Sequence, residues 1–445
     1  MTDLVHPRPF PLARPREVLQ TVRDATLAAL FVAMAFSISA TQLLLALLFL
    51  LVLPWPSVAR ERGVPHRLAR LWREMWTDAE PLRHHPLTPP LLSFAGLTLL
   101  SALSSGDPGE SLSRAIHSIL RMAMFYLVLW HTRDTTHALR VWQGFLAVLT
   151  LMACYGLLQA YACRVQLRFV PESWRGDLCV HSSRINGPFS IYMTFGGVLL
   201  LGALFFVAYL ANVPWRRAWW MIPAGTVTIT ALALTYSRNA WLGFAAGALG
   251  LVVTGRRGVR VILVLTGITA AVALVSPDSV RQRALSMVDL HDLTVRDRVA
   301  MWKSGLAMIR DHPLLGVGPG EVRAWYPQYR RPEAVRPSTG HLHNSPIQVA
   351  AERGIPALAV WLWLWVVFFR EGRRVLSRLG PGPSPRRALV CASLSGVGGF
   401  LVAGLFEHNF GDGEVVMLVY ALMALPFIVE QELGGGGRPT DGGTG

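Results

Sequence analysis

Long apolar runs recur along most of the chain and are separated by shorter polar segments. A helix needs about 20 predominantly apolar residues to cross a bilayer, and the sequence offers twelve candidate spans on this criterion. The pattern therefore predicts an all-α polytopic membrane protein. The candidate spans are residues 23–39, 41–57, 88–104, 115–131, 138–162, 188–210, 218–235, 239–254, 259–275, 346–369, 387–406 and 413–431.

Composition and charge support the same class of protein. Hydrophobic residues make up 52% of the chain and charged residues only 16%, which is too apolar for a soluble protein of this length. The net charge of +15 comes from arginine far more than from lysine. In a soluble protein that excess suggests nucleic acid, but here the basic residues lie between apolar runs and no nucleic-acid-binding motif is present. We therefore expect membrane lipids and anionic lipid-linked substrates as partners, and no nucleic acid.

The distribution of charge predicts an orientation in the membrane. If the N-terminus is cytoplasmic, every short inside loop is basic, including 58–87 and 370–387, as the positive-inside rule requires. The outside loops 105–113 and 407–412 contain acidic residues and no lysine or arginine. Both termini are therefore expected in the cytoplasm.

One segment between the ninth and tenth candidate spans is much longer than the other loops. Residues 276–345 form this outside loop, and residues 295–310 within it place apolar side chains at three- and four-residue spacing. Such spacing predicts an amphipathic helix that lies on the membrane or caps the bundle. The apolar positions are Val299, Trp302, Leu306 and Ile309.

The chain is expected to form a single transmembrane domain, residues 1–445, into which the long loop is inserted. Residues 432–445 are rich in glycine and predict a disordered cytoplasmic tail. Cys163 and Cys179 flank a polar outside loop. A disulfide between them and two free thiols both remain open from the sequence.

Four arginines on the outside are candidates for binding an anion. Arg184 and Arg238 lie at span ends, where a charge is costly and tends to be functional or paired, although snorkelling to lipid phosphate is the alternative. Arg296 and Arg298 lie in the long loop. Because arginine binds phosphate groups bidentately, these side chains predict a diphosphate site near the membrane surface.

The densest polar motif is HLHNSPIQVAAERG, residues 341–354, where the long loop re-enters the membrane. His341 and His343 are candidates for a general base, because the ordinary pKa of histidine is close to neutrality. Asn344 is expected to orient the imidazole or to hold a sugar hydroxyl. The alternative is a pair of interfacial histidines followed by a capping asparagine.

A polar stripe continues from this motif into the next predicted span. Asn344, Gln348 and Glu352 are spaced by four residues, so they share one helical face, which should point into the bundle rather than at lipid. We expect no metal site, because two histidines two residues apart need further ligands and no carboxylate pair lies near them in the sequence.

Three motifs in this order resemble the O-antigen ligase and polymerase superfamily. They are TYSRNAWLG around Arg238, R-x-x-x-W-K-x-x-x-x-M-I-x-D-H-P-L-L-G-V-G-P-G from Arg298, and HLHNSPIQVAAERG around His343. The resemblance covers roughly residues 180–370.

The resemblance implies a GT-C-like membrane enzyme of the Gram-negative inner membrane with a periplasmic active site. It implies glycan transfer from undecaprenyl diphosphate to lipid A–core oligosaccharide, inverting, without metal or cofactor. By motif position His343 is the implied base, with His341 as a possible partner. Arg238 and Arg298 are implied ligands of the diphosphate, and Arg184 follows from a looser motif.

Other functions remain open from the sequence. Within the superfamily they are an O-antigen polymerase and an oligosaccharyltransferase that acts on protein Ser or Thr. A transporter of lipid-linked glycans is the alternative outside it. Transporters place substrate-binding residues near the bilayer midplane, whereas the polar residues here gather at one face, so a transferase is favoured.

Overall fold

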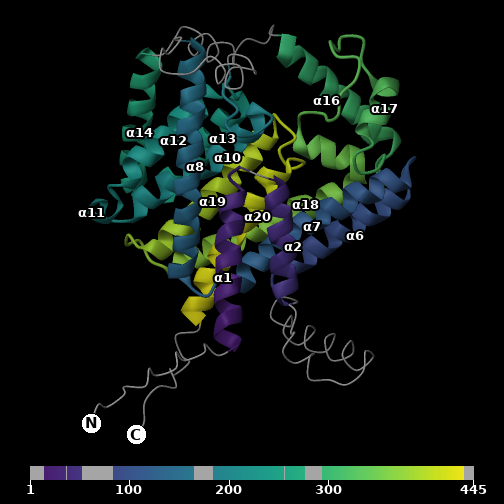
Figure 1. Cartoon of the computed structure of the whole chain (residues 1–445). Coiled ribbons are helices and arrows are strands. Elements are labelled where there is room, and N and C mark those ends of the chain that lie inside the picture. The colour runs from purple at the N-terminus through teal and green to yellow at the C-terminus, as the bar shows by residue number, and fades with distance from the viewer. Residues whose placement is uncertain are drawn as a thin grey trace, which may run out of the picture.

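The computed structural model describes residues 15–36, 38–52, 84–164, 184–254, 256–275 and 293–434, and these residues form helices and connecting loops without strands (Figure 1). The helices are α1 (Pro15–Ala33), α2 (Ile38–Val52), α6 (Thr88–Leu103), α7 (Pro108–His131), α8 (Thr135–Arg164), α10 (Tyr192–Asn212), α11 (Trp215–Ala218), α12 (Met221–Leu234), α13 (Arg238–Thr254), α14 (Arg256–Val275), α16 (Leu293–Asp311), α17 (Val322–Tyr329), α18 (Ser345–Arg378), α19 (Pro385–Gly404) and α20 (Gly413–Gly434).

A helix overlaps each of the twelve predicted spans. Among the described residues, six helices are long and apolar enough to cross a membrane, namely α7, α8, α10, α18, α19 and α20. Shorter apolar helices lie within α2, α6, α12 and α14. The all-helical polytopic architecture is confirmed in this form, while the count of twelve spans and the GT-C-like architecture stay predictions.

The centre of the bundle is built from α10, α19 and α20. Within their apolar windows 83%, 78% and 89% of the residues are buried inside the protein, which fits helices that are apolar on every side. Glycines bring α13 close to α19, because a Cβ on Gly243 would lie 2.5 Å from the Gly399 carbonyl oxygen. This close contact fixes α13, whose first residue is Arg238.

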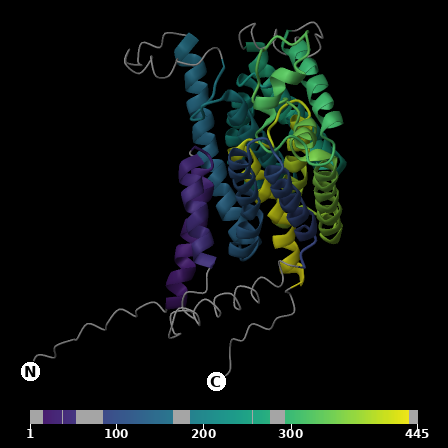
Figure 2. The ribbon, with the colours of Figure 1, turned by 90° about the vertical axis from the view of Figure 1, so that its right-hand side faces the viewer.

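Residues 293–344 form a cap at one end of the bundle, where α16 and α17 lie side by side (Figures 1 and 2). The predicted amphipathic helix 295–310 is present as α16. The large apolar row is divided: Trp302 and Ile309 contact the protein, whereas Val299 and Leu306 are 38% and 58% exposed. The buried side is built mainly from smaller residues and methionines. At Gly305 the packing leaves no room for a side chain, since a Cβ there would lie 2.6 Å from atoms of Leu342 and Ile347.

A kink in α18 ties this cap to the bundle. Gly354 has φ of +83° and Pro356 follows it, so the helix cannot continue its hydrogen-bond ladder there. The backbone N–H of Val317 donates to the Ala351 carbonyl at 2.9 Å, and that of Gly318 donates to the Glu352 carbonyl at 2.9 Å. The GVGPG motif, residues 316–320, therefore donates the hydrogen bonds that the next turn of the helix would have supplied. These bonds fix the first half of α18.

Some sequence predictions fall outside the described residues. The side chains of Cys163 and Cys179 are among them, so the disulfide question stays open. The helix α20 ends at Gly434, so residues 432–434 of the predicted tail are helical, which corrects the expectation of disorder for those positions. The rest of the tail lies outside the described part.

Candidate functional site

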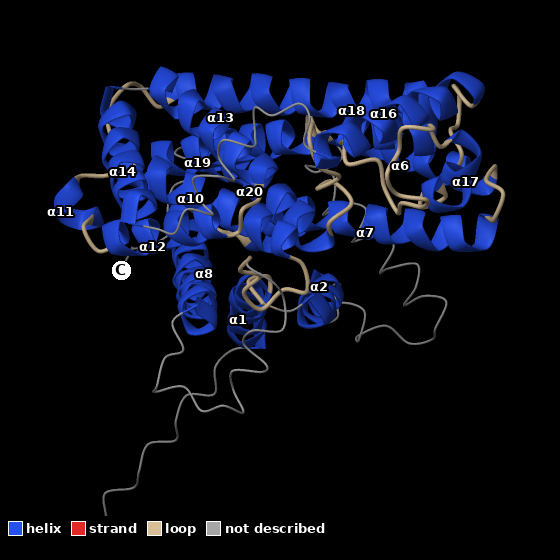
Figure 3. Ribbon diagram, turned by 90° about the horizontal axis from the view of Figure 1, so that it is seen from above, coloured by secondary structure: helices blue, strands red, loops and turns tan. Residues whose placement is uncertain are grey.

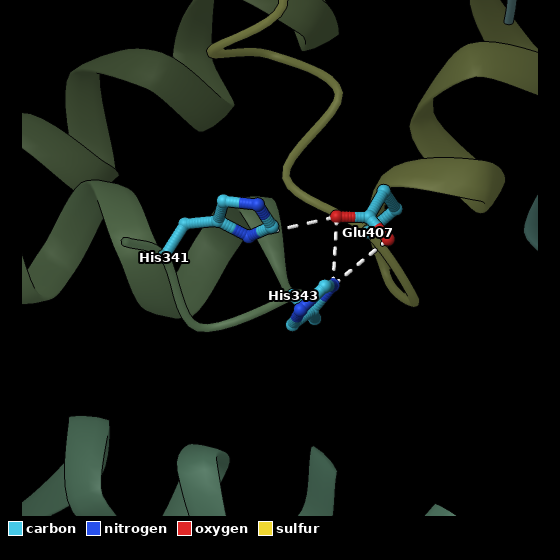
Figure 4. Close-up of side chains that lie close together, drawn as sticks. All are labelled: His341, His343 and Glu407. Atoms are coloured by element: carbon cyan, nitrogen blue, oxygen red, sulfur yellow. Dashed lines mark hydrogen bonds and ion pairs between the residues drawn. The ribbon is translucent and has the colours of Figure 1, made fainter. Parts of the chain in front are cut away.

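A buried carboxylate, Glu407, lies at the centre of the predicted site (Figure 4). Both of its oxygens lie 2.8 Å from Nδ1 of His343. Nδ1 of His341 lies 3.6 Å from Oε1, and Nη2 of Arg298 lies 3.3 Å from Oε2. The structure thus joins three predicted residues through a fourth that the motifs did not identify. Its one signal in the sequence was an acidic residue in a loop predicted to lie on the same side of the membrane.

The start of α18 is hydrogen-bonded to the segment that carries Glu407. Nδ2 of Asn344 donates to the Leu405 carbonyl at 2.8 Å, and Oγ of Ser345 lies 3.1 Å from the Glu407 carbonyl oxygen. Oδ1 of Asn344 accepts the Ile347 N–H at 2.9 Å as a helix cap. The side chain of Asn344 therefore binds backbone groups. Glu407 instead orients the imidazole of His343, which is one of the two tasks that the sequence suggested for Asn344.

Two non-glycine residues in the described part have a positive φ, and both lie in the recognised motifs. They are His343 with φ of 50° and Tyr236 with φ of 53°. This region is unfavourable for residues with a side chain and persists where surrounding contacts impose it, often at functional sites. Near His343 those contacts include the Leu342 N–H, which donates to Oε1 of Gln348 at 2.8 Å, and Thr339, whose hydroxyl donates to the His341 carbonyl at 2.7 Å.

The polar stripe of α18 is buried and internally hydrogen-bonded. Nε2 of Gln348 donates to Oε1 of Glu352 at 2.7 Å, and the same oxygen accepts the Gly320 N–H at 3.0 Å. Oε2 of Glu352 pairs with the buried Arg353. Gln348 and Glu352 therefore link the loop that carries His341 and His343 to the GVGPG motif through hydrogen bonds.

The electrostatics of the cluster favour an ionised carboxylate at Glu407 and a neutral imidazole at His341. Burial raises the pKa of Glu407, but its hydrogen bond to His343 and the charges of His343, His341 and Arg298 outweigh burial and hold that pKa at about 2. Burial lowers the pKa of His341 to about 4 against the opposing effect of Glu407. Burial also lowers the pKa of the neighbouring His408 well below its ordinary value.

The ionised Glu407 determines the tautomer of His343. A carboxylate only accepts hydrogen bonds, so Nδ1 of His343 carries the hydrogen that points at Glu407. In the neutral imidazole Nε2 is then unprotonated and able to take up a proton. This is the arrangement that a general base requires.

The four candidate arginines occupy different places. Arg298 is 22% exposed and lies on Glu407, whereas Arg296 is exposed two residues earlier on α16. Arg238 is half-buried at the start of α13, next to Asn239. Arg184 lies 4.5 Å from the ring centre of Tyr192 and forms a cation–π contact with it. The structure therefore unites Arg298 with the histidines and gives Arg184 an aromatic partner instead.

A cavity of ≈ 710 Å³ lies beside the cluster, within the usual range for ligand pockets. His341, Glu407 and His408 line it, together with Asn239 next to Arg238. Residues of α7 and α10 also line it, among them Arg114, His117, Arg121, Met193 and Thr194. The cavity therefore brings His341, Glu407 and His408 together with the start of α13 and basic residues of α7.

The cluster also offers a possible set of metal ligands, since the ligand atoms of His341, His343 and Glu407 lie within 4.8 Å of one another. Two imidazoles and one carboxylate form a ligand set that zinc accepts. The sequence did not lead us to expect this grouping, because Glu407 is 64 residues from His343. Arg298 already neutralises part of the carboxylate charge, which disfavours a cation here.

Three of the predicted site residues lie in a segment that is similar to a known protein family. The family model described as O-antigen ligase matches residues 223–362. This segment holds Arg238, Arg298 and His343 and ends before Glu407. No curated protein matches the chain significantly. Over residues 223–362 the chain is therefore similar to the O-antigen ligase family.

Proposed function

We propose that the protein is an O-antigen ligase, which transfers O-antigen glycan from undecaprenyl diphosphate to the lipid A–core oligosaccharide. The observation that carries this proposal is the buried His343–Glu407 pair with Arg298 on the same carboxylate, beside a cavity large enough for sugar residues. We place this reaction at the periplasmic face of the bacterial inner membrane, with both termini of the chain in the cytoplasm.

The proposed chemistry is a single inverting displacement. Nε2 of His343 removes the proton from the acceptor hydroxyl while its oxygen forms a bond to the anomeric carbon of the donor glycan. The bond from that carbon to the diphosphate oxygen breaks, and the diphosphate departs with the electron pair. Glu407 stabilises the imidazolium that forms. Arg298 and Arg238 stabilise the negative charge that develops on the diphosphate.

Transfer should require no divalent metal, because arginine supplies the positive charge. We expect purified protein in lipid nanodiscs to join donor to acceptor without an ion gradient and to retain its rate in EDTA. The measurement is the amount of glycan-bearing lipid A–core formed with time. A loss in EDTA that Mg²⁺ or Zn²⁺ restores would contradict this mechanism and point to an ion on His341, His343 and Glu407.

The same assay separates the alternative functions by product. Attachment of preformed glycan to lipid A–core supports a ligase. Elongation of one lipid-linked glycan by another indicates a polymerase, and glycan on a protein acceptor indicates an oligosaccharyltransferase. Product that forms only with an ion gradient, or movement of intact donor between leaflets, would indicate a transporter.

Arg298→Ala should raise the KM for the donor about tenfold to a hundredfold, because a charge-assisted hydrogen bond to phosphate contributes about 1.5–3 kcal/mol. Arg298→Lys should recover only part of this loss, since lysine lacks the planar bidentate donor. Donor and acceptor concentrations are varied separately to measure both KM values.

Arg296→Ala is the matched control for this substitution, because Arg296 lies on the same helix and is exposed. Its KM values should stay within about twofold of wild type. An equal rise in the KM values for donor and acceptor in Arg298→Ala would argue for a structural defect instead of a lost diphosphate ligand.

A further inference from the structure

A second cavity, of ≈ 400 Å³, lies among α2, α7 and α20. Its walls are mainly apolar and include Leu45 and Phe49 of α2, Leu120 and Leu127 of α7, and Met417 of α20. The helix pair α1 and α2 stands at the edge of the bundle (Figures 2 and 3). The cavity is therefore an apolar space at the periphery of the protein, where a hydrocarbon chain is the natural occupant.

Two basic side chains are shared by the apolar cavity and the polar one. His117 and Arg121 of α7 line both cavities, and we call their position between the two the neck. Arg121 lies within a helix long and apolar enough to span the membrane, and its Nη1 donates to the Gly411 carbonyl at 3.1 Å. A charged residue within a span is costly and commonly marks a substrate pathway.

Acidic groups also face the neck, so its charge depends on their protonation. Asp412 and Glu414 line the polar cavity. Burial and a hydrogen bond with Glu414 raise the pKa of Asp412 to about 7, which reduces the negative charge of the pair at neutral pH. Asp412 therefore offsets less of the positive charge of Arg121 at neutral pH than a fully ionised carboxylate would.

The covalent structure of the donor matches this arrangement. Its reacting carbon, diphosphate and hydrocarbon chain follow one another directly, so a diphosphate in the polar cavity must send its chain through an adjoining apolar opening. The lipid of the acceptor is separated from the reacting hydroxyl by an oligosaccharide and need not lie here. A methylene group is similar in size to a water molecule, whose share of liquid volume is about 30 Å³, so the cavity holds roughly a dozen carbons.

We propose that the cavity among α2, α7 and α20 binds the phosphate-proximal isoprene units of the donor, with Arg121 and His117 at the neck beside the first phosphate. The remaining isoprene units extend from the cavity into the bilayer. This inference rests on the proposed function, since it assumes a polyisoprenyl diphosphate donor.

Ala46→Trp tests the proposal, because Ala46 lines the apolar cavity and an indole there would fill part of it. Glycan donors with the full undecaprenyl chain and with a short prenyl chain are compared in nanodiscs. We expect Ala46→Trp to raise the KM for the long-chain donor by about tenfold or more. The KM values for the short-chain donor and for the acceptor should change less than about twofold. Leu43→Trp is the matched control, since Leu43 is 73% exposed and does not line the cavity.

Three outcomes of the KM measurements on Ala46→Trp alone would overturn the proposal. They are an unchanged KM for the long-chain donor in Ala46→Trp, an equal rise for both donors, and a rise for the acceptor alone, which would assign the cavity to an acyl chain of the acceptor. Equal effects of Leu43→Trp and Ala46→Trp would also overturn it, by indicating a general disturbance of α2.

A binding measurement separates this proposal from the proposed function. A photoreactive polyprenyl diphosphate without glycan is crosslinked to the wild-type protein, and the labelled peptides are identified. Label in residues 42–50 and 117–127 that is lost in Ala46→Trp supports the cavity even if no glycan transfer occurs. Active transfer with label only elsewhere would refute the cavity and leave the proposed function standing.

Discussion

Replacing His343 with alanine should lower the kcat of glycan transfer by about 10²–10⁴, the usual contribution of a general base. The reason is the loss of the Nε2 atom that takes up the acceptor proton, while Arg298 still binds the donor. The KM for the donor should therefore change little. The measurement is a rate at saturating donor and acceptor, with membrane insertion checked by the yield and elution profile of the purified variant.

His341→Ala is the informative comparison, because His341 is the adjacent histidine of the motif and faces the same carboxylate. Its Nδ1 lies 3.6 Å from Glu407, beyond hydrogen-bonding distance, and burial keeps its imidazole neutral at pH 7. We expect its kcat to fall less than about tenfold. Near-normal activity of His343→Ala with an inactive His341→Ala would reassign the base to His341.

The helices were predictable from the sequence because each carries its own apolar run. An apolar run of sufficient length must be helical in a membrane, since every backbone group then finds its partner within the segment. Among the described residues, the six helices long and apolar enough to cross a membrane and the shorter apolar helices fit that requirement. It is a local property, so neighbours in space are not needed to recognise it.

The pairing of His343 with Glu407 was not predictable in the same way. The two residues are 64 positions apart, and their contact depends on how α18 packs against the segment between α19 and α20. The motifs marked His343 and Arg298, but neither names its carboxylate partner. The topology predicted only that Glu407 lies on the same side of the membrane as His343, which limits the candidates without selecting one.

Side-chain spacing predicted the helix α16 but left open whether its apolar row faces the membrane or the bundle. The large apolar residues Val299 and Leu306 suggested a face, yet Gly305 and Ser304 lie on the buried side. Close packing of two segments favours small residues at the contact, because they let the backbones approach. Hydrophobic periodicity weighs large side chains most and therefore misses a contact made through glycine.

Glu407→Gln should lower kcat by about 10³–10⁴, because an amide in place of the carboxylate neither fixes the reactive tautomer of His343 nor stabilises its imidazolium. Glu407→Asp keeps the charge on a shorter side chain and should recover part of the rate. The double variant His343→Ala/Glu407→Gln should be no slower than His343→Ala alone, since the two residues act as one unit. Additive losses would show that Glu407 acts independently of His343.

The pH dependence of activity distinguishes this role from a purely structural one. The pKa of Glu407 is about 2, below its ordinary value of 4.5, so the carboxylate stays charged throughout the working range and favours the protonated imidazole beside it. Removing that charge in Glu407→Gln disfavours imidazolium, so the acid limb of the kcat–pH profile should move to lower pH. The stabilising effect of the carboxylate on the fold is complete above pH 4.5 and declines as pH falls toward 2. The melting temperatures of wild type and Glu407→Gln should therefore differ most at neutral pH and converge in acid. A slow variant whose acid limb stays in place would mean that Glu407 holds the loop without assisting proton transfer.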